Sequence, residues 1–140
     1  STESINILLP QWLPPIAWYF GGSVKLDLFN SLEDLKIIKE IGCNFCLDIS
    51  HVFMCSFIQP SLIEDMISSL KLVSHIHIAG ASCIDGEGED ISTFNQKQKE
   101  LLRLVIELPH IKVLEVWQGH LNNHAGFKKS LYDLKNVCSS

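Results

Sequence analysis

Polar side chains that can bind metals follow three short apolar stretches of this chain. Asp48 and His51 lie in CLDISH, His75 and His77 lie in SHIHIAG, and Glu115 lies in VLEVW. Side chains alternate across a strand, so the two histidines of SHIHIAG share one face, and the last inward residue of each stretch reaches the strand's carboxyl end. In parallel α/β folds, ligands bind at that end of the sheet.

One Asp, one or two His and one Glu at a common sheet edge form a mixed nitrogen and oxygen ligand set for Zn²⁺, Mn²⁺ or Mg²⁺. Each residue also has a plainer interpretation. Asp48 could cap the following helix, His75 could be a hydrogen-bonded core residue, and Glu115 could pair with a neighbouring cation. Three such residues on successive strands, at equivalent depth, strengthen the case for a shared metal site.

Two other segments carry side chains suited to a sugar. The aromatic segment WYF, which begins with Trp18, could stack against the C–H faces of a sugar or could pack at a subunit contact. The polar run after Glu115, which contains Gln118 and His120, could bind hydroxyl groups or form a solvated loop.

Composition predicts one domain over residues 1–140. The chain has 140 residues, of which 46% are hydrophobic, and no apolar run approaches the roughly 18 residues of a membrane span. The amino end lacks a signal-like segment, and five cysteines without framework spacing suit a reducing compartment. A net charge of −5 without a large basic cluster argues against a nucleic-acid partner. We therefore expect a cytoplasmic protein with neither a membrane nor a nucleic acid as partner.

Hydrophobic periodicity predicts alternating strands and helices, with residues 10–30 as a long loop whose prolines and paired glycines exclude regular structure. The alternation implies an α/β fold with a parallel sheet and right-handed crossovers. The expected strands cover residues 5–9, 43–49, 73–79 and 111–117, and the expected helices cover residues 31–41, 61–70, 93–107 and 126–137.

Four such units make a (β/α)4 half of a TIM barrel, which has eight strands. An open four-stranded sheet leaves two edges with unpaired backbone groups and one apolar face without a cover. We expect a second copy in a homodimer, or a missing N-terminal half of a longer chain, to complete the barrel. A self-contained four-stranded sheet with helices on both sides is the alternative.

The motifs LDISH, HIHIAGASCIDGEG and LEVW, in this order, resemble the carboxy-terminal half of the xylose-isomerase-like barrel superfamily, which contains sugar phosphate isomerases/epimerases and endonuclease IV. The resemblance covers nearly the whole chain. The segments WYFGG, DGEG and VWQGHLNN are also similar to barrel modules attached to bacterial nonulosonic (sialic-type) acid synthases.

This resemblance implies a divalent metal cofactor, namely Mn²⁺, Zn²⁺, Mg²⁺ or Co²⁺, and a small-molecule sugar substrate. Asp48, His77 and Glu115 would be the metal ligands, Glu115 would also be the catalytic base, and His51 would act beside it on the substrate. His75 would support the ligands. The implied reaction is isomerisation or epimerisation, in which a carboxylate moves a proton between neighbouring carbons next to a polarised carbonyl.

Two features depart from the family pattern and keep other functions open. The family's fourth ligand is a Glu on an earlier strand, where this chain has Ile7 or Leu8, and Gly80 stands where an Asp follows the His-x-His motif. A degenerate barrel that binds a sugar or assembles without catalysis is therefore the main alternative. Endonuclease IV-like phosphodiester cleavage is a further one, and it predicts a multinuclear zinc site and a basic groove.

Overall fold

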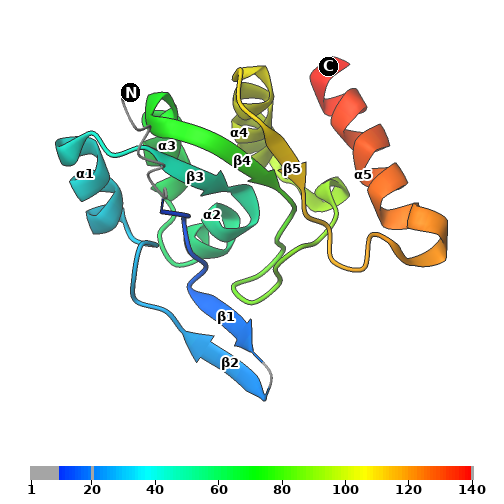
Figure 1. Ribbon diagram of the computed structural model, residues 1–140, viewed down its shortest axis with the longest axis horizontal. Coiled ribbons are helices and arrows are strands. Elements are labelled where there is room, and N and C mark those ends of the chain that lie inside the picture. The colour runs from blue at the N-terminus through cyan, green and yellow to red at the C-terminus, as the bar shows by residue number, and fades with distance from the viewer. Residues whose placement is uncertain (1–9, 20, 140) are drawn as a thin grey trace, which may run out of the picture.

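A computed structural model of the protein describes residues 10–19 and 21–139. Its centre is a parallel sheet in the order β3 (Phe45–Asp48), β4 (Val73–Ile78) and β5 (Lys112–Leu114) (Figure 1). The predicted α/β class and the parallel pairing are confirmed for these three strands. The helices are α1 (Leu32–Ile41), α2 (Ile49–Ser56), α3 (Leu62–Ile67), α4 (Gln96–Glu107) and α5 (Leu121–Ser139), with 3-10 turns at Leu70–Leu72 and Ile91–Thr93.

A fourth segment runs beside β3. The predicted strand over residues 5–9 lies outside the described residues, but Gln11 forms a parallel bridge with Cys46. The Cys46 amide donates to Pro10 O at 2.9 Å, and the Trp12 amide donates to Cys46 O at 3.0 Å. The chain therefore enters the sheet next to β3, and β5 forms the opposite edge of the described sheet.

The first helix begins and ends where its sequence predicts. Ser31 caps α1 by accepting from the Asp34 amide, and the Asp34 side chain accepts from the Ser31 amide in return. This reciprocal pair satisfies two amides at the helix start. Gly42 ends the helix in the left-handed conformation with φ +67°, which suits glycine because it has no Cβ.

The helix α2 was not predicted. It follows β3 directly, and its residues from Ile49 to Cys55 are all buried. A helix buried on every side has no polar stripe, so the periodicity that marks an amphipathic helix is missing. The helix expected over residues 61–70 is also shorter, because α3 ends at Ile67 and a 3-10 turn follows.

The prediction of a long irregular loop over residues 10–30 was wrong. The antiparallel hairpin of β1 (Ile16–Tyr19) and β2 (Gly22–Lys25) lies within it. The prolines precede the first strand instead of interrupting it, and Gly21 and Gly22 have φ values of +105° and +145°. The paired glycines thus supply the tight turn between the strands.

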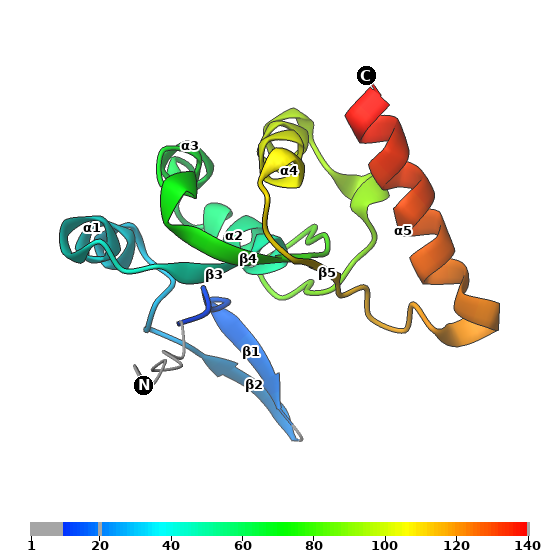
Figure 2. The ribbon, with the colours of Figure 1, turned by 45° about the horizontal axis from the view of Figure 1, so that its top comes forward.

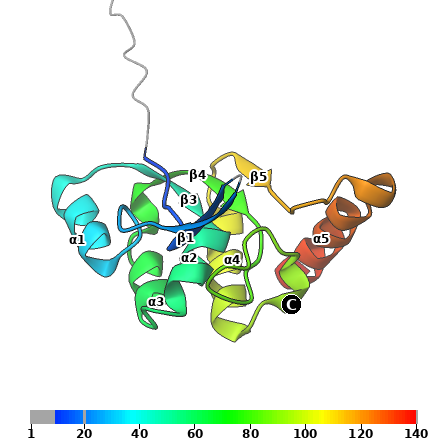
Figure 3. The same ribbon diagram turned by 90° about the horizontal axis from the view of Figure 1, so that it is seen from below.

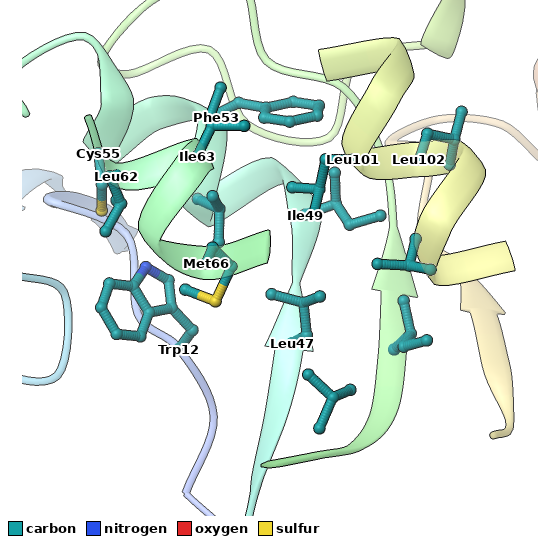
Figure 4. Packing of buried hydrophobic residues seen from close by; sticks show 14 of the residues in the cluster. Trp12, Leu47, Ile49, Phe53, Cys55, Leu62, Ile63, Met66, Leu101 and Leu102 are labelled. Carbon is teal, nitrogen blue, oxygen red and sulfur yellow. The ribbon is translucent and has the colours of Figure 1, made fainter. Parts of the chain in front are cut away.

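The two faces of the central sheet have different neighbours. Helices α2, α3 and α4 lie on one side of the strands (Figure 3), and the β1–β2 hairpin extends away from α3 and α4 in the view of Figure 2. Phe45, Leu47 and Ile76 point to the helix side and are fully buried. Figure 4 shows Leu47 among apolar side chains of the helices, which include Ile49, Leu62, Met66, Leu101 and Leu102.

No helix in the described ranges is long and apolar enough to cross a membrane.

Candidate metal centre

Asp48, His77 and Glu115 meet where β3, β4 and β5 end. Asp48 is the last residue of β3 and is the register partner of His77 on β4, and Glu115 follows β5 directly. His77 Nδ1 lies 3.6 Å from Asp48 Oδ2 and 3.2 Å from Glu115 Oε2. One ligand atom from each residue lies within 4.8 Å of the other two. The structure thus places these predicted ligands together in one cluster.

Asp48 uses its two oxygens for different purposes. Oδ1 accepts from the His51 amide at 3.2 Å and caps α2. Oδ2 faces His77 and accepts from Gln11 Nε2 at 3.1 Å. The capping interpretation is therefore correct for one oxygen, and the other oxygen is turned toward the cluster.

The imidazole of His77 carries a buried nitrogen without a hydrogen bond. Its Nδ1 atom is shielded from solvent and has no hydrogen-bond partner, although two carboxylates lie within 3.6 Å. The contact with Asp48 raises the pKa of His77 above its ordinary value, burial opposes this, and the charge of Glu115 adds to the rise. A cation that replaced the imidazole proton would satisfy both carboxylates and this nitrogen.

The spacing of these donors fits one divalent cation. Ligand atoms held about 2.1 Å from one ion lie about 3.0 Å apart in octahedral and about 3.4 Å apart in tetrahedral geometry. The two separations from His77 Nδ1, 3.2 and 3.6 Å, are close to these values. One nitrogen and two carboxylates suit Mn²⁺, Zn²⁺, Co²⁺ or Mg²⁺ and leave coordination positions for a substrate.

His51 is buried beside the cluster, and both of its ring nitrogens are occupied. Nδ1 lies 2.8 Å from the Trp12 carbonyl oxygen, which can only accept, so Nδ1 carries a hydrogen. Nε2 lies 2.8 Å from Glu87 Oε1. Burial alone would lower the pKa of His51, but Glu87, Asp48 and the Trp12 carbonyl together raise it. The geometry therefore makes His51 a residue that holds Glu87 in place.

The loop over residues 80–89 brings Glu87 to this position. Buried Ser50 donates to Gly80 O at 2.9 Å and accepts from the Gly88 amide at 3.1 Å, so it fastens the loop at both ends. Gly88 has φ +73° and lies against Trp117, whose amide donates to Gly88 O at 2.8 Å. A side chain at Gly88 would collide with the indole ring.

A small depression lies at the cluster. Asp48, Glu87 and Glu115 line it together with Ser50, Ala79, Gly88 and Trp117, and its volume of about 10 Å³ is enough for a single ion or water. A larger cavity of about 530 Å³ lies elsewhere, between β5, α4 and α5, and its lining is mostly aliphatic. The carboxylates of the cluster therefore line the small depression and not this aliphatic cavity.

A second row of side chains lies one step farther from the strand ends. Cys46 on β3 is the register partner of His75 on β4, on the same face as Asp48 and His77. His75 therefore lies beside the cluster of Asp48, His77 and Glu115, and its supporting role stays a prediction. Burial, followed by the charges of Asp48 and Glu115, raises the pKa of the Cys46 thiol to about 12.

Three predicted substrate-binding residues are not brought to the cluster by any contact among the described residues. Trp18 lies on β1 with an exposed side chain. Gln118 and His120 lie in the exposed segment between β5 and α5, and Gln118 has φ +55°. The side chains of Tyr19 and Phe20, which complete the aromatic segment, lie outside the described part of the chain.

Sequence reasoning missed Gln11 and Glu87. The resemblance pointed to Ile7 or Leu8 for the place of the fourth ligand, and both lie outside the described residues. The structure puts Gln11 beside Asp48 at the end of the segment that pairs with β3. The Gly-rich sequence around Glu87 indicated a loop, but the return of this loop to His51 depends on contacts with α2 and Trp117.

Comparisons with protein-family models, with curated proteins and with solved structures find no match to this chain.

Proposed function

We propose that the protein is a divalent-metal-dependent isomerase or epimerase that acts on a sugar or sugar derivative by proton transfer. The observation that supports this proposal is the convergence of Asp48, Glu115 and the unbonded Nδ1 of His77 at one edge of a parallel sheet. A cation bound there would polarise a carbonyl or hydroxyl oxygen and acidify the neighbouring C–H bond.

Glu115 is the group that would move the carbon-bound proton. Its side chain is 46% exposed, whereas Asp48 is buried and uses both oxygens in hydrogen bonds. An exposed carboxylate at the edge of the depression can take a proton from the carbon beside the carbonyl and return it to the next carbon.

Glu87 and His51 would move the second proton of the reaction. Isomerisation also transfers a hydroxyl proton from one oxygen to its neighbour, which requires a group that can both give and accept. Glu87 lines the same depression as Glu115, and its Oε1 lies 2.8 Å from His51 Nε2, which is close enough for a proton to pass between the two groups. Glu115 would therefore move the carbon-bound proton, and Glu87 with His51 would move the hydroxyl proton.

The substrate would lie over the depression and not inside it, because the depression has room only for an ion or water. We propose that the three-stranded sheet is part of a half-barrel. Ile111 and Val113, at the edge strand of the described sheet, are exposed, so a second copy or another part of a longer chain could pair there and enclose the substrate.

Cation binding is the first test. Isothermal titration with Mn²⁺ should give one site, and Glu115→Gln should weaken binding by about 10- to 100-fold, because it removes a charged ligand. Glu107→Gln is the matched control, since Glu107 is an exposed carboxylate on the distant helix α4. Equal affinities of both variants would contradict the assignment of the cluster.

Proton transfer is the second test. A panel of aldoses, ketoses and their phosphates is incubated in D2O with protein and Mn²⁺, and proton NMR follows loss of the signal from the carbon beside the carbonyl. Exchange should require both the cation and Glu115. This assay does not depend on knowing the product.

A non-catalytic binding module is the second candidate. The resemblance places the fourth carboxylate ligand at Ile7 or Leu8, which cannot bind a metal, and the side chain that contacts Asp48 from the segment beside β3 is the neutral amide of Gln11, so the ligand set lacks one negative charge. Cation binding without deuterium exchange on any sugar of the panel would favour this candidate.

A further inference from the structure

We propose that Cys46, His75 and His77 form a second site, for a thiophilic cation such as Zn²⁺, Cd²⁺ or Cu⁺. One potential ligand atom from each of these residues lies within 4.8 Å of the other two. Thiolate and imidazole ligands prefer soft and borderline cations, whereas carboxylates prefer Mg²⁺ and Mn²⁺. This site uses neither Asp48 nor Glu115, but it shares His77 with the proposed carboxylate site, so the closing experiments change residues that the two sites do not share.

The strand register explains why these residues meet. Cys46 pairs with His75 across β3 and β4, and His77 lies two residues farther along β4 on the same face. The rings of His75 and His77 are 5.6 Å apart between centroids. The register shifts between Phe45 and Cys46, but from Cys46 onward the pairing with β4 is continuous and holds all three side chains, which favours a preformed site over one assembled from loops.

Hydrogen bonds select the nitrogen with which His75 could bind. Ser74 Oγ donates to Phe45 O at 2.9 Å, so its lone pairs remain to accept from His75 Nδ1, which lies 3.2 Å away. The hydrogen of neutral His75 is then on Nδ1, and Nε2 keeps a free lone pair. Metal-binding histidines commonly have this arrangement, in which the other ring nitrogen donates to a fixed acceptor.

Binding replaces the thiol proton of Cys46. This proton goes to solvent when the sulfur–metal bond forms, and each imidazole binds through a ring nitrogen that carries no proton. Cys46 itself is 1% exposed, but His75 and His77 are only half-buried, so the cation would enter past the imidazoles from the face that α2, α3 and α4 do not cover.

Cadmium titration of the reduced protein tests the site through the ultraviolet charge-transfer band of a thiolate–cadmium bond. The wild type should give a saturable band with one equivalent, and Cys46→Ala should remove it. Cys55→Ala is the matched control, because Cys55 is equally buried but lies on α2 away from both histidines, and it should keep the band. His75→Gln should weaken binding by at least about tenfold.

Two further measurements keep the proposal separate from the proposed function. Glu115→Gln should weaken Mn²⁺ binding but retain the cadmium band, whereas Cys46→Ala should retain Mn²⁺ binding and lose the cadmium band. If Cys46→Ala fails to fold, ¹¹³Cd NMR of the wild type decides the question, since mixed sulfur and nitrogen ligands shift the resonance far from that of oxygen ligands. A band that survives in folded Cys46→Ala, or an oxygen-type resonance, would overturn the proposal.

Discussion

The two faces of the β3–β4 pair are made from alternate residues of the same strands, but they meet different surroundings. On the helix side, Leu47 and Ile76 are fully buried among apolar side chains of α2, α3 and α4. On the opposite side, which we call the polar face, Asp48, His75 and His77 lie among titratable groups. Successive residues of a strand point to opposite faces, so one short strand serves both stability and chemistry. Mutations of the two faces should therefore have separable effects.

The largest expected difference between the faces is in stability. Ile76→Ala should lower the free energy of unfolding by about 2 to 5 kcal/mol, because it leaves a cavity in a fully buried cluster. Val113→Ala, on the polar face and 39% exposed, should cost less than about 1 kcal/mol. Urea denaturation followed by circular dichroism measures both values. A similar loss for Val113→Ala would mean that the polar face is also packed.

A change at Gln11 tests the polar face through its affinity for a cation. Gln11→Glu adds a carboxylate next to Asp48, so we expect Mn²⁺ affinity to rise by about tenfold, or about 1.4 kcal/mol. The same change should lower the stability of the metal-free protein, because two neighbouring carboxylates repel each other. Calorimetric titration and urea denaturation measure the two effects. Gln11→Leu is the control, and an equal gain in affinity there would refute the charge explanation.

The smallest expected effect is a pH dependence of the free energy of unfolding, which arises from His51 beside the polar face. The folded protein raises the pKa of His51, against the effect of burial, through Glu87, Asp48 and the Trp12 carbonyl. Protonated His51 therefore stabilises the fold fully below the unfolded pKa of about 6.5, and this contribution is lost as the pH rises through the higher folded pKa.

Replacing Glu87 should reduce this pH dependence. In Glu87→Gln, the pKa of His51 should fall, and the loss of stability above about pH 6.5 should become smaller. NMR titration of the His51 ring and urea denaturation with a chelator present measure these changes. Glu89→Gln is the matched control on the same loop, because Glu89 accepts from Ser82 and does not contact His51. A similar fall in the pKa of His51 in Glu89→Gln would mean that the loop as a whole, and not the contact between His51 and Glu87, sets this pKa.

Local patterns were sufficient for much of the fold. The Ser31–Asp34 capping box and Gly42 fixed the bounds of α1, because these signals act within a few residues. The strand centres were also found, since β3 and β4 are buried and apolar on their helix side. The predicted strand around β5 was too long, because its pairing with β4 covers Lys112–Leu114 and ends with the bonds of Ile111 O and Glu115 N to β4.

Other elements depended on distant contacts. The helix α2 carries no amphipathic signal because both of its sides are buried. The β1–β2 hairpin was hidden by prolines and glycines that usually break structure but here surround and turn a strand pair. A single sequence does not reveal which backbone groups will pair across such a segment.

The sequence by itself determined which residues of the candidate site end their strands and which face they share. Asp48, His77 and Glu115 could be proposed as a set because side-chain alternation and strand ends are local properties of the chain. Tertiary structure decided the rest. Register between strands set the distances among these groups and brought Cys46 to His75, the bridge beside β3 placed Gln11 next to Asp48, and loop packing placed Glu87 next to His51. Gln11 and Asp48 alone are 37 positions apart, so such pairings depend on how the elements pack and not on local preference.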